Sequence, residues 1–177
     1  MIAIRWLTTA IATLLLAGTA QSTAAPGETV ARFEAELSGN AFPDITGSLA
    51  TGHAVLILHP DRQTVDIDLD VTGLNSDALW DRLVAAPVGP THIHLYSPDG
   101  DAVLIMAFPF GEAYSNTARG LRLRAKDIGY ADNAALVNSA RSFADFTSAL
   151  RSGNAYFNIH TDMFNDGEIA GKFVEKK

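Results

Sequence analysis

The segment Thr64–Val71, TVDIDLDV, has the clearest secondary-structure pattern in the chain. Apolar and polar residues alternate along it, and successive side chains of an extended strand point to opposite faces. One face of this strand is therefore apolar, and the other carries a row of aspartates. A strand of an antiparallel sheet with one face in the core and one face in water has this pattern. The segment predicts an antiparallel β-protein.

Similar strand patterns lie on both sides of this segment, and turn residues separate them. The connection 73–89 is long, with a short helical turn expected around Asp77–Leu83. Between 132 and 151, apolar residues recur at spacings of three and four, and Gly153 follows. We predict one inserted amphipathic helix there, with Ser142 as a point of interruption. The other expected strands are Val30–Leu37, Gly52–Leu58, 91–96, Ala102–Phe108, Ala118–Lys126, Ala155–His160 and Glu168–Val174, and Ser97–Gly100 is the expected turn of a 91–108 hairpin.

The first 25 residues have the composition of a secretory signal peptide. Arg5 supplies a positive charge, Trp6–Ala17 is apolar, and Gly18–Ala25 is small and polar. The apolar run is well short of the ~20 residues that a membrane-spanning helix requires. We therefore expect a signal peptide over residues 1–25, one domain over residues 26–177, and a location in the periplasm or outside the cell, with no membrane contact after cleavage.

The chain is acidic and contains no cysteine. It has 13 Lys and Arg residues against 20 Asp and Glu residues, and removal of Arg5 with the signal changes the net charge from −7 to 12 − 20 = −8. An acidic surface argues against nucleic acids and anionic membranes as partners and favours cations, metal ions included. Without cysteine, neither disulfides nor thiolate ligands can stabilise the protein.

The segment Gly89–Gly100, GPTHIHLYSPDG, contains two histidines one residue apart. If the segment is extended, His92 and His94 lie on one face. The segment 154–173 repeats the order of strand, histidine, turn and strand, and it supplies His160. Neutral imidazoles suit copper and zinc, and a third ligand from another strand completes a trigonal or tetrahedral site. These three histidines are our candidate ligands for copper, with zinc as the alternative. The competing interpretation is ordinary half-buried histidines that donate to backbone carbonyls.

Other residues are weaker candidates for the same site. Met106 and Met163 are close in sequence to the histidines and could offer a thioether to copper(I). His53 begins a strand, and His59 follows six residues later. In an extended chain the two are ~20 Å apart, so they cannot share an ion. The polar residues around His160 could orient an imidazole as well as stabilise a turn. These residues are Asn158, Asp162 and Glu168.

Three longer segments resemble the CHRD domain, a module named after chordin and found also as a stand-alone secreted domain in bacteria. They read ARFEAELSGNAFPDITGSLATGHAVLIL, GPTHIHLYSPDGDAVLIM and FTSALRSGNAYFNIHTDMFNDGEIAGKF, and together they span about residues 31–174. The resemblance implies a compact antiparallel β-sandwich or β-barrel, of Greek-key type and similar in plan to copper-zinc superoxide dismutase. It also implies that the family's histidine pair is His92 and His94, that its Asn-x-His-Thr motif is Asn158, His160 and Thr161, and that its acidic position is Glu168.

The chain departs from the family pattern at two places. Ala170 stands where an arginine is usual, and Asn165-Asp166 replaces a turn that contains proline. A role that depends on that arginine therefore cannot be transferred to this chain.

The sequence favours a periplasmic protein that binds, stores or delivers a transition metal, with the ion and a periplasmic protein as partners. Hydrolase motifs such as Gly-x-Ser-x-Gly and His-Glu-x-x-His are absent from the sequence, and we assign no catalytic residue. Two other functions stay open. One is a copper-only enzyme of superoxide-dismutase type, because five histidines are too few for that enzyme's bimetal site. The other is a metal-free module that binds another protein.

Overall fold

A computed structural model describes residues 29–97 and 102–177 of the chain. Residues 1–25, the expected signal peptide, and most of the expected turn Ser97–Gly100 lie outside the described residues. Within them, ten strands form one antiparallel sheet in the order β5-β4-β8-β9-β1-β2-β3-β7-β6, and β10 also pairs with β1. The strands are β1 (Ala31–Ser38), β2 (Thr51–His59), β3 (Thr64–Thr72), β4 (Thr91–Tyr96), β5 (Ala102–Phe108), β6 (Tyr114–Asn116), β7 (Leu121–Gly129), β8 (Ala155–Ile159), β9 (Ile169–Lys172) and β10 (Val174–Lys176).

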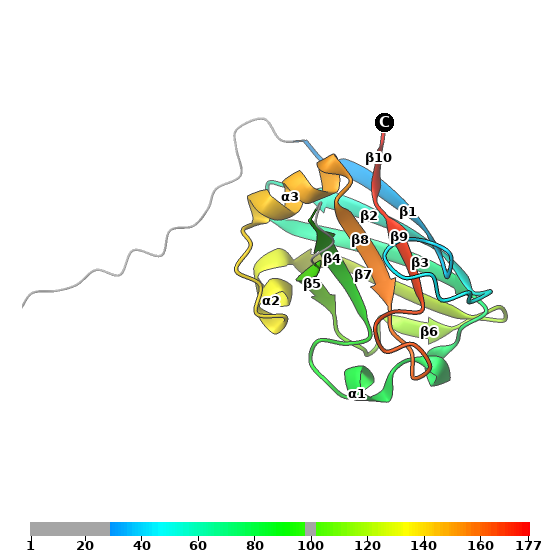
Figure 1. Cartoon of the computed structure of the whole chain (residues 1–177). Coiled ribbons are helices and arrows are strands. Elements are labelled where there is room, and N and C mark those ends of the chain that lie inside the picture. Colours follow the sequence, from blue (N-terminus) through cyan, green and yellow to red (C-terminus); the bar gives the residue numbers. More distant parts are fainter. Residues whose placement is uncertain (1–28, 98–101) are drawn as a thin grey trace, which may run out of the picture.

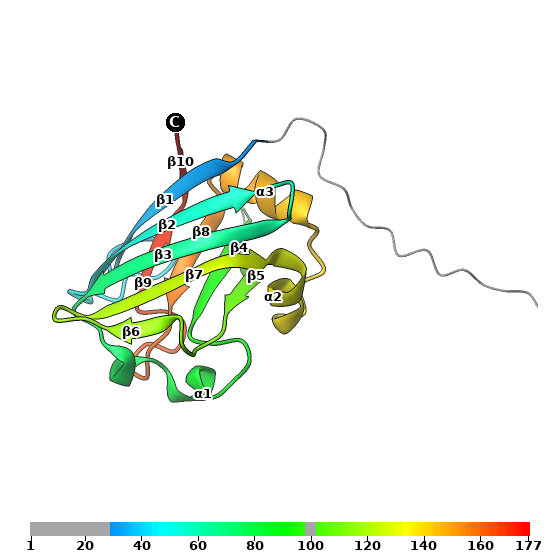
Figure 2. The same ribbon diagram turned by 180° about the vertical axis from the view of Figure 1, so that it is seen from behind.

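The sheet curls into a half-barrel, so that its two halves face each other across the core (Figures 1 and 2). One half consists of β1, β2, β3, β7 and β6, and the other of β9, β8, β4 and β5. The apolar face of β3 lies in the core as its alternation predicts, with Val65 and Leu69 fully buried. The aspartates on the other face of β3 pair with arginines of β7, as Arg122 with Asp70 and Arg124 with Asp68. The predicted mainly β, antiparallel fold is confirmed.

Two short strands differ from the sequence prediction. We expected an irregular segment before residue 118, but β6 pairs there with the first half of β7. The predicted strand 168–174 is divided into β9 and β10, which follow one another along β1. Phe173, which is fully buried, lies between them. Such short pieces carry too few residues for an alternation to be recognised in the sequence.

The inserted segment forms two helices where we predicted one that is interrupted at Ser142. These are α2 (Tyr130–Leu136) and α3 (Phe143–Ser152). The first ends before Asn138, which has a left-handed backbone with φ of 51°, and Ser142 starts the second with a capping box to Asp145. The stacked rings of Tyr130 and Phe146, 5.0 Å apart, join the two helices. Both lie at one end of the sheet (Figure 1), where α2 packs against β5 and α3 against β8 and β10.

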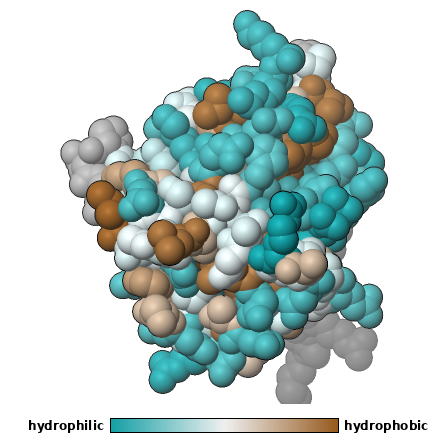
Figure 3. Space-filling view, turned by 90° about the vertical axis from the view of Figure 1, so that its right-hand side faces the viewer, coloured by the Kyte–Doolittle hydropathy of each residue, from teal (hydrophilic) through white to brown (hydrophobic). Residues whose placement is uncertain are grey.

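The long connection between β3 and β4 contains the expected helical turn as η1 (Ser76–Ala78) and α1 (Asp81–Val84). It lies at the end of the sheet opposite α2 and α3 (Figure 1). The face on the right of Figure 1 is mostly hydrophilic, with hydrophobic residues in separate small groups (Figure 3). None of the helices in residues 29–97 and 102–177 is long and apolar enough to span a membrane.

Candidate metal centre

Strand β4 sends its residues to two different environments. Ile93 is fully buried in the hydrophobic core between the halves of the sheet. His92 and His94, at the opposite parity, therefore lie on the outer face of this half of the sheet. In the register with β8, His92 lies opposite Asn158 and His94 opposite Tyr156. Two imidazoles thus share one face, as the spacing predicted.

His160 is placed beside this pair by the pairing of β8 with β4. The strand β8 ends at Ile159, which lies opposite Thr91, and the backbone N–H of His160 donates to the carbonyl of Pro90 at 3.0 Å. On its other side, the carbonyl of His160 accepts from the N–H of Trp80, at 3.1 Å. The backbone of His160 is therefore held on both sides, at the start of the turn that follows β8.

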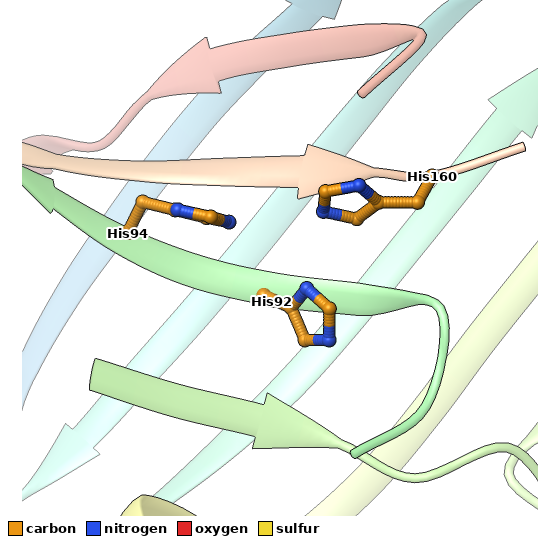
Figure 4. A group of neighbouring side chains, drawn as sticks. All are labelled: His92, His94 and His160. Carbon is orange, nitrogen blue, oxygen red and sulfur yellow. The ribbon is translucent and has the colours of Figure 1, made fainter. Parts of the chain in front are cut away.

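The three side chains converge on one volume (Figure 4). One ring nitrogen from each of His92, His94 and His160 lies within 4.8 Å of the other two. The ring centroids are 4.8 Å apart for His92 and His160, 5.8 Å for His94 and His160, and 5.9 Å for His92 and His94. All three residues are buried, with 3 %, 6 % and 6 % of their surface exposed, respectively.

The hydrogen bonds of these imidazoles leave at least one nitrogen on each ring without a partner. Nδ1 of His160 lies 2.8 Å from the carbonyl oxygen of Asn165, which can only accept, so this nitrogen carries the proton. Nε2 of His160 and both ring nitrogens of His94 are buried with no hydrogen-bond partner among the described residues, and the ring of His92 interacts only with the backbone of Val88 and Gly89. Buried polar atoms are nearly always hydrogen-bonded in proteins, so a cluster of unpaired nitrogens indicates a place for a ligand.

All three imidazoles have lowered pKa values. Burial, followed by the neighbouring His160 and His94, lowers the pKa of His92 to about 3. Burial and then His160 lower the pKa of His94 to about 4. Burial also lowers the pKa of His160, although the bond to Asn165 and the charge of Asp166 act in the opposite direction. The three rings are therefore neutral at pH 7, which is the form that binds metals.

Three neutral imidazoles that face one another can hold one transition-metal ion. Ligand nitrogens at about 2.0–2.1 Å from a tetrahedral ion lie about 3.4 Å from each other. The nitrogens in this cluster lie within 4.8 Å of one another, so the spacing is close to that of a metal site. Three protein ligands leave a fourth position for water or another ligand, as in sites that exchange ligands.

The structure places the weaker candidates away from these rings. Nδ1 of His53 lies 2.8 Å from a carboxylate oxygen of Glu36 on the exposed surface, and the metal-ligand cluster does not contain it. Met106 is fully buried in the core and lies opposite Ile93, so its side chain is on the other face of β4 and β5. Met163 is 82 % exposed.

The polar candidates around His160 organise the backbone near the cluster. The buried carboxylate of Glu168 accepts from the hydroxyls of Ser48 and Thr161, each at 2.6 Å. Asp162 accepts from the N–H of Asp81 at 3.2 Å. Asn158 is 1 % exposed, and its Oδ1 has no partner within the described part of the chain. Of the three, Asn158 is the one that shares the face of His92.

A cleft of about 550 Å³ opens onto the cluster. His94 and His160 line its inner part, and Tyr96, two residues beyond His94, stacks against the His94 ring with centroids 6.0 Å apart. Sequence reasoning missed Tyr96, although its parity in β4 is that of the two histidines. Sequence reasoning also missed the bond from His160 to Asn165, because the acceptor is a backbone carbonyl and does not depend on the side chain at that position. The other lining residues are Phe42, Pro43, Asp44, Ala102, Leu104, Asn165 and Asp166.

Comparison with known proteins gives one match. The family model of the CHRD domain matches residues 33–173, a range that contains every strand of the sheet except the start of β1 and the whole of β10. No curated protein and no solved structure matches the chain. The matched range includes all three histidines of the cluster, and with this coverage the chain belongs to the CHRD domain family.

Proposed function

We propose that this CHRD-domain protein binds one transition-metal ion through His92, His94 and His160, and that it stores or delivers that ion. The observation that carries the proposal is the convergence of three buried imidazoles whose facing nitrogens have no hydrogen-bond partner among the described residues. A merely structural role does not account for an unpaired nitrogen on each of three facing rings, because each costs about 1–3 kcal/mol when buried without a partner. A bound ion would satisfy one nitrogen on each ring.

Copper is the preferred ion and zinc the alternative. Neutral imidazole binds both metals, and divalent copper binds nitrogen ligands more tightly than zinc does. Two of the three histidines line a cleft, and a store or carrier would need such an opening to exchange its ion. The acidic chain and its signal-like first 25 residues support a periplasmic or secreted location, where a second protein would receive the metal.

Metal content of the purified full chain tests the proposal. After incubation with copper and removal of excess metal, mass spectrometry of the elements should find about one copper per wild-type chain. The double variant His92→Ala, His94→Ala should retain about none. The double variant His53→Ala, His59→Ala is the matched control, because it removes the same number of histidines at positions held by Glu36 and Asp66. Equal copper in the two double variants would contradict the proposal.

A superoxide assay on the copper-loaded chain separates storage from enzymatic activity. The chain has five histidines, and the two outside the cluster lie next to carboxylates on other strands. We therefore expect no rate above that of the His92→Ala, His94→Ala variant. A rate well above that background would favour the copper-only enzyme.

A further inference from the structure

The cleft above the histidine cluster has acidic groups and no basic ones. Asp44 comes from the loop after β1, and Asp166 from the turn after β8. Both aspartates are exposed, and neither has an ion-pair partner in the described ranges. No Lys or Arg is among the described residues that line the cleft. Its opening is therefore negatively charged.

The charges of the two carboxylates reach the rings inside the cleft as well as the solvent outside it. Burial is the main cause of the lowered pKa of His160 and of the raised pKa of Tyr96; the charge of Asp166 opposes the first shift, and the charge of Asp44 adds to the second. Each therefore lies close to a ring of the cleft's inner part. His94 and His160, each 6 % exposed, line the same cleft and carry unpartnered nitrogens. A negative opening thus leads to buried ligands that have no other partner.

We propose that this cleft is the route by which a hydrated metal cation reaches the histidines, and that Asp44 and Asp166 steer the cation into it. The inference rests on the proposed metal site. A funnel lined by one sign of charge raises the local concentration of the opposite ion and its rate of association. The same field repels small anions from the fourth position of a bound metal. The cleft therefore selects cations over anions.

The rate of copper association measures this steering. Trp80 is a natural reporter, since its backbone N–H donates to the backbone carbonyl of His160, and copper(II) quenches the fluorescence of nearby tryptophans. All proteins carry Trp6→Phe, which leaves Trp80 as the one tryptophan of the full chain. Stopped-flow mixing with aqueous copper(II), in a non-chelating buffer at pH 6, gives the association rate constant at low and high salt.

The test variant is Asp44→Asn, Asp166→Asn. We expect it to associate about tenfold more slowly than the parent at low ionic strength. At 1 M salt, where the screening length falls to about 3 Å, the two rates should converge. Copper stoichiometry should stay at one per chain, because the histidines are unchanged.

The control variant is Asp61→Asn, Asp132→Asn, which changes the net charge equally. Both control aspartates are exposed and follow strand ends far from the cluster, Asp61 in the turn after β2 and Asp132 in α2. This control should associate within about twofold of the parent. Equal slowing of both variants, or no slowing of either with full copper binding, overturns the steering role alone. A wild-type chain that takes up no copper overturns the metal site as well.

Discussion

His160 donates its Nδ1 proton to the carbonyl oxygen of Asn165 at 2.8 Å, and this bond determines which nitrogen the ring presents to His92 and His94. The carbonyl can only accept a hydrogen bond, so Nε2 is the unprotonated nitrogen. Metal-bound histidines commonly have this arrangement, in which the second ring nitrogen is held by a carbonyl or a carboxylate. The backbone of the turn after β8 thus sets the tautomer and the orientation of His160 that the proposed metal site requires.

The tautomer of His160 is the first testable prediction. In the metal-free protein at pH 7, nitrogen NMR of the imidazoles should show His160 with a protonated Nδ1 and a free Nε2. Addition of zinc, which is diamagnetic, should move the Nε2 resonance of this ring and leave Nδ1 protonated. A protonated Nε2 in the metal-free protein would contradict the bond to Asn165.

The stability of the metal-free protein should fall in acid because its buried histidines resist protonation. The pKa of His92 is lowered from 6.5 to about 3 and that of His94 to about 4. Between these values and 6.5 the unfolded chain binds more protons, so the free energy of unfolding falls as the pH falls. Each ring contributes a slope of up to about 1.4 kcal/mol per pH unit in this window.

Urea unfolding at pH 7, 6, 5 and 4 measures this dependence. The His92→Ala, His94→Ala variant is the control, since it lacks both groups and should lose less stability over the same range. Parallel curves for the two proteins would show that these rings are not protonated on unfolding.

Glu168 should be important for stability because its buried carboxylate joins two segments. It accepts from Ser48 in the loop after β1 and from Thr161 beside His160. Glu168→Ala leaves both hydroxyls without this acceptor, and we expect a loss of about 2–4 kcal/mol in the free energy of unfolding. Glu168→Gln keeps the shape and one acceptor oxygen and should lose less stability.

The control is Glu112→Ala, at an exposed position, which should change the free energy of unfolding by less than about 0.5 kcal/mol. Similar losses for both alanine variants in urea unfolding would refute this role.

Gly89, two residues before β4, has no room for a side chain. Its φ is +71°, and an added Cβ would collide with the backbone carbonyl of Phe108. Gly89→Ala should therefore destabilise the protein by more than about 3 kcal/mol, or prevent folding. Copper binding should weaken with it, because Gly89 leads into the histidine strand.

Alanine variants of two other glycines distinguish the effect of the positive φ from the effect of the close contact. Gly47 has a similar φ of +73° but nothing within 4 Å of an added Cβ, so Gly47→Ala should cost only the backbone strain of about 1–2 kcal/mol. Gly111 has open space and no positive φ, and Gly111→Ala should be neutral or stabilise by about 0.4–1 kcal/mol. Thermal unfolding of the three variants should give this order. If Gly89→Ala lowers the melting temperature no more than Gly47→Ala does, the backbone moves enough to avoid the contact with Phe108, and the prediction is wrong.

The strands that the sequence predicted well are those with a long, regular alternation. Strand β3 alternates over its whole length, and its aspartates and core residues lie where the pattern put them. The inserted helix shows the limit of such patterns, because its apolar spacing continues across 137–142, where the backbone turns. The break depends on a left-handed Asn138 and the Ser142 cap; the sequence indicated an interruption at Ser142, but periodicity alone does not show that the first helix ends before Asn138.

By itself, the sequence determined the antiparallel β-architecture and the common face of His92 and His94, because both follow from the two-residue period of a strand. Only the tertiary structure decided that His160 meets them. That meeting depends on the pairing of β4 with β8, which joins residues 60 to 68 positions apart, and on the bond from His160 to Asn165. Strand pairing and ring orientation arise from packing between distant segments, and no local pattern encodes them. The acidic cleft has the same origin, since two loops far apart in sequence form its opening.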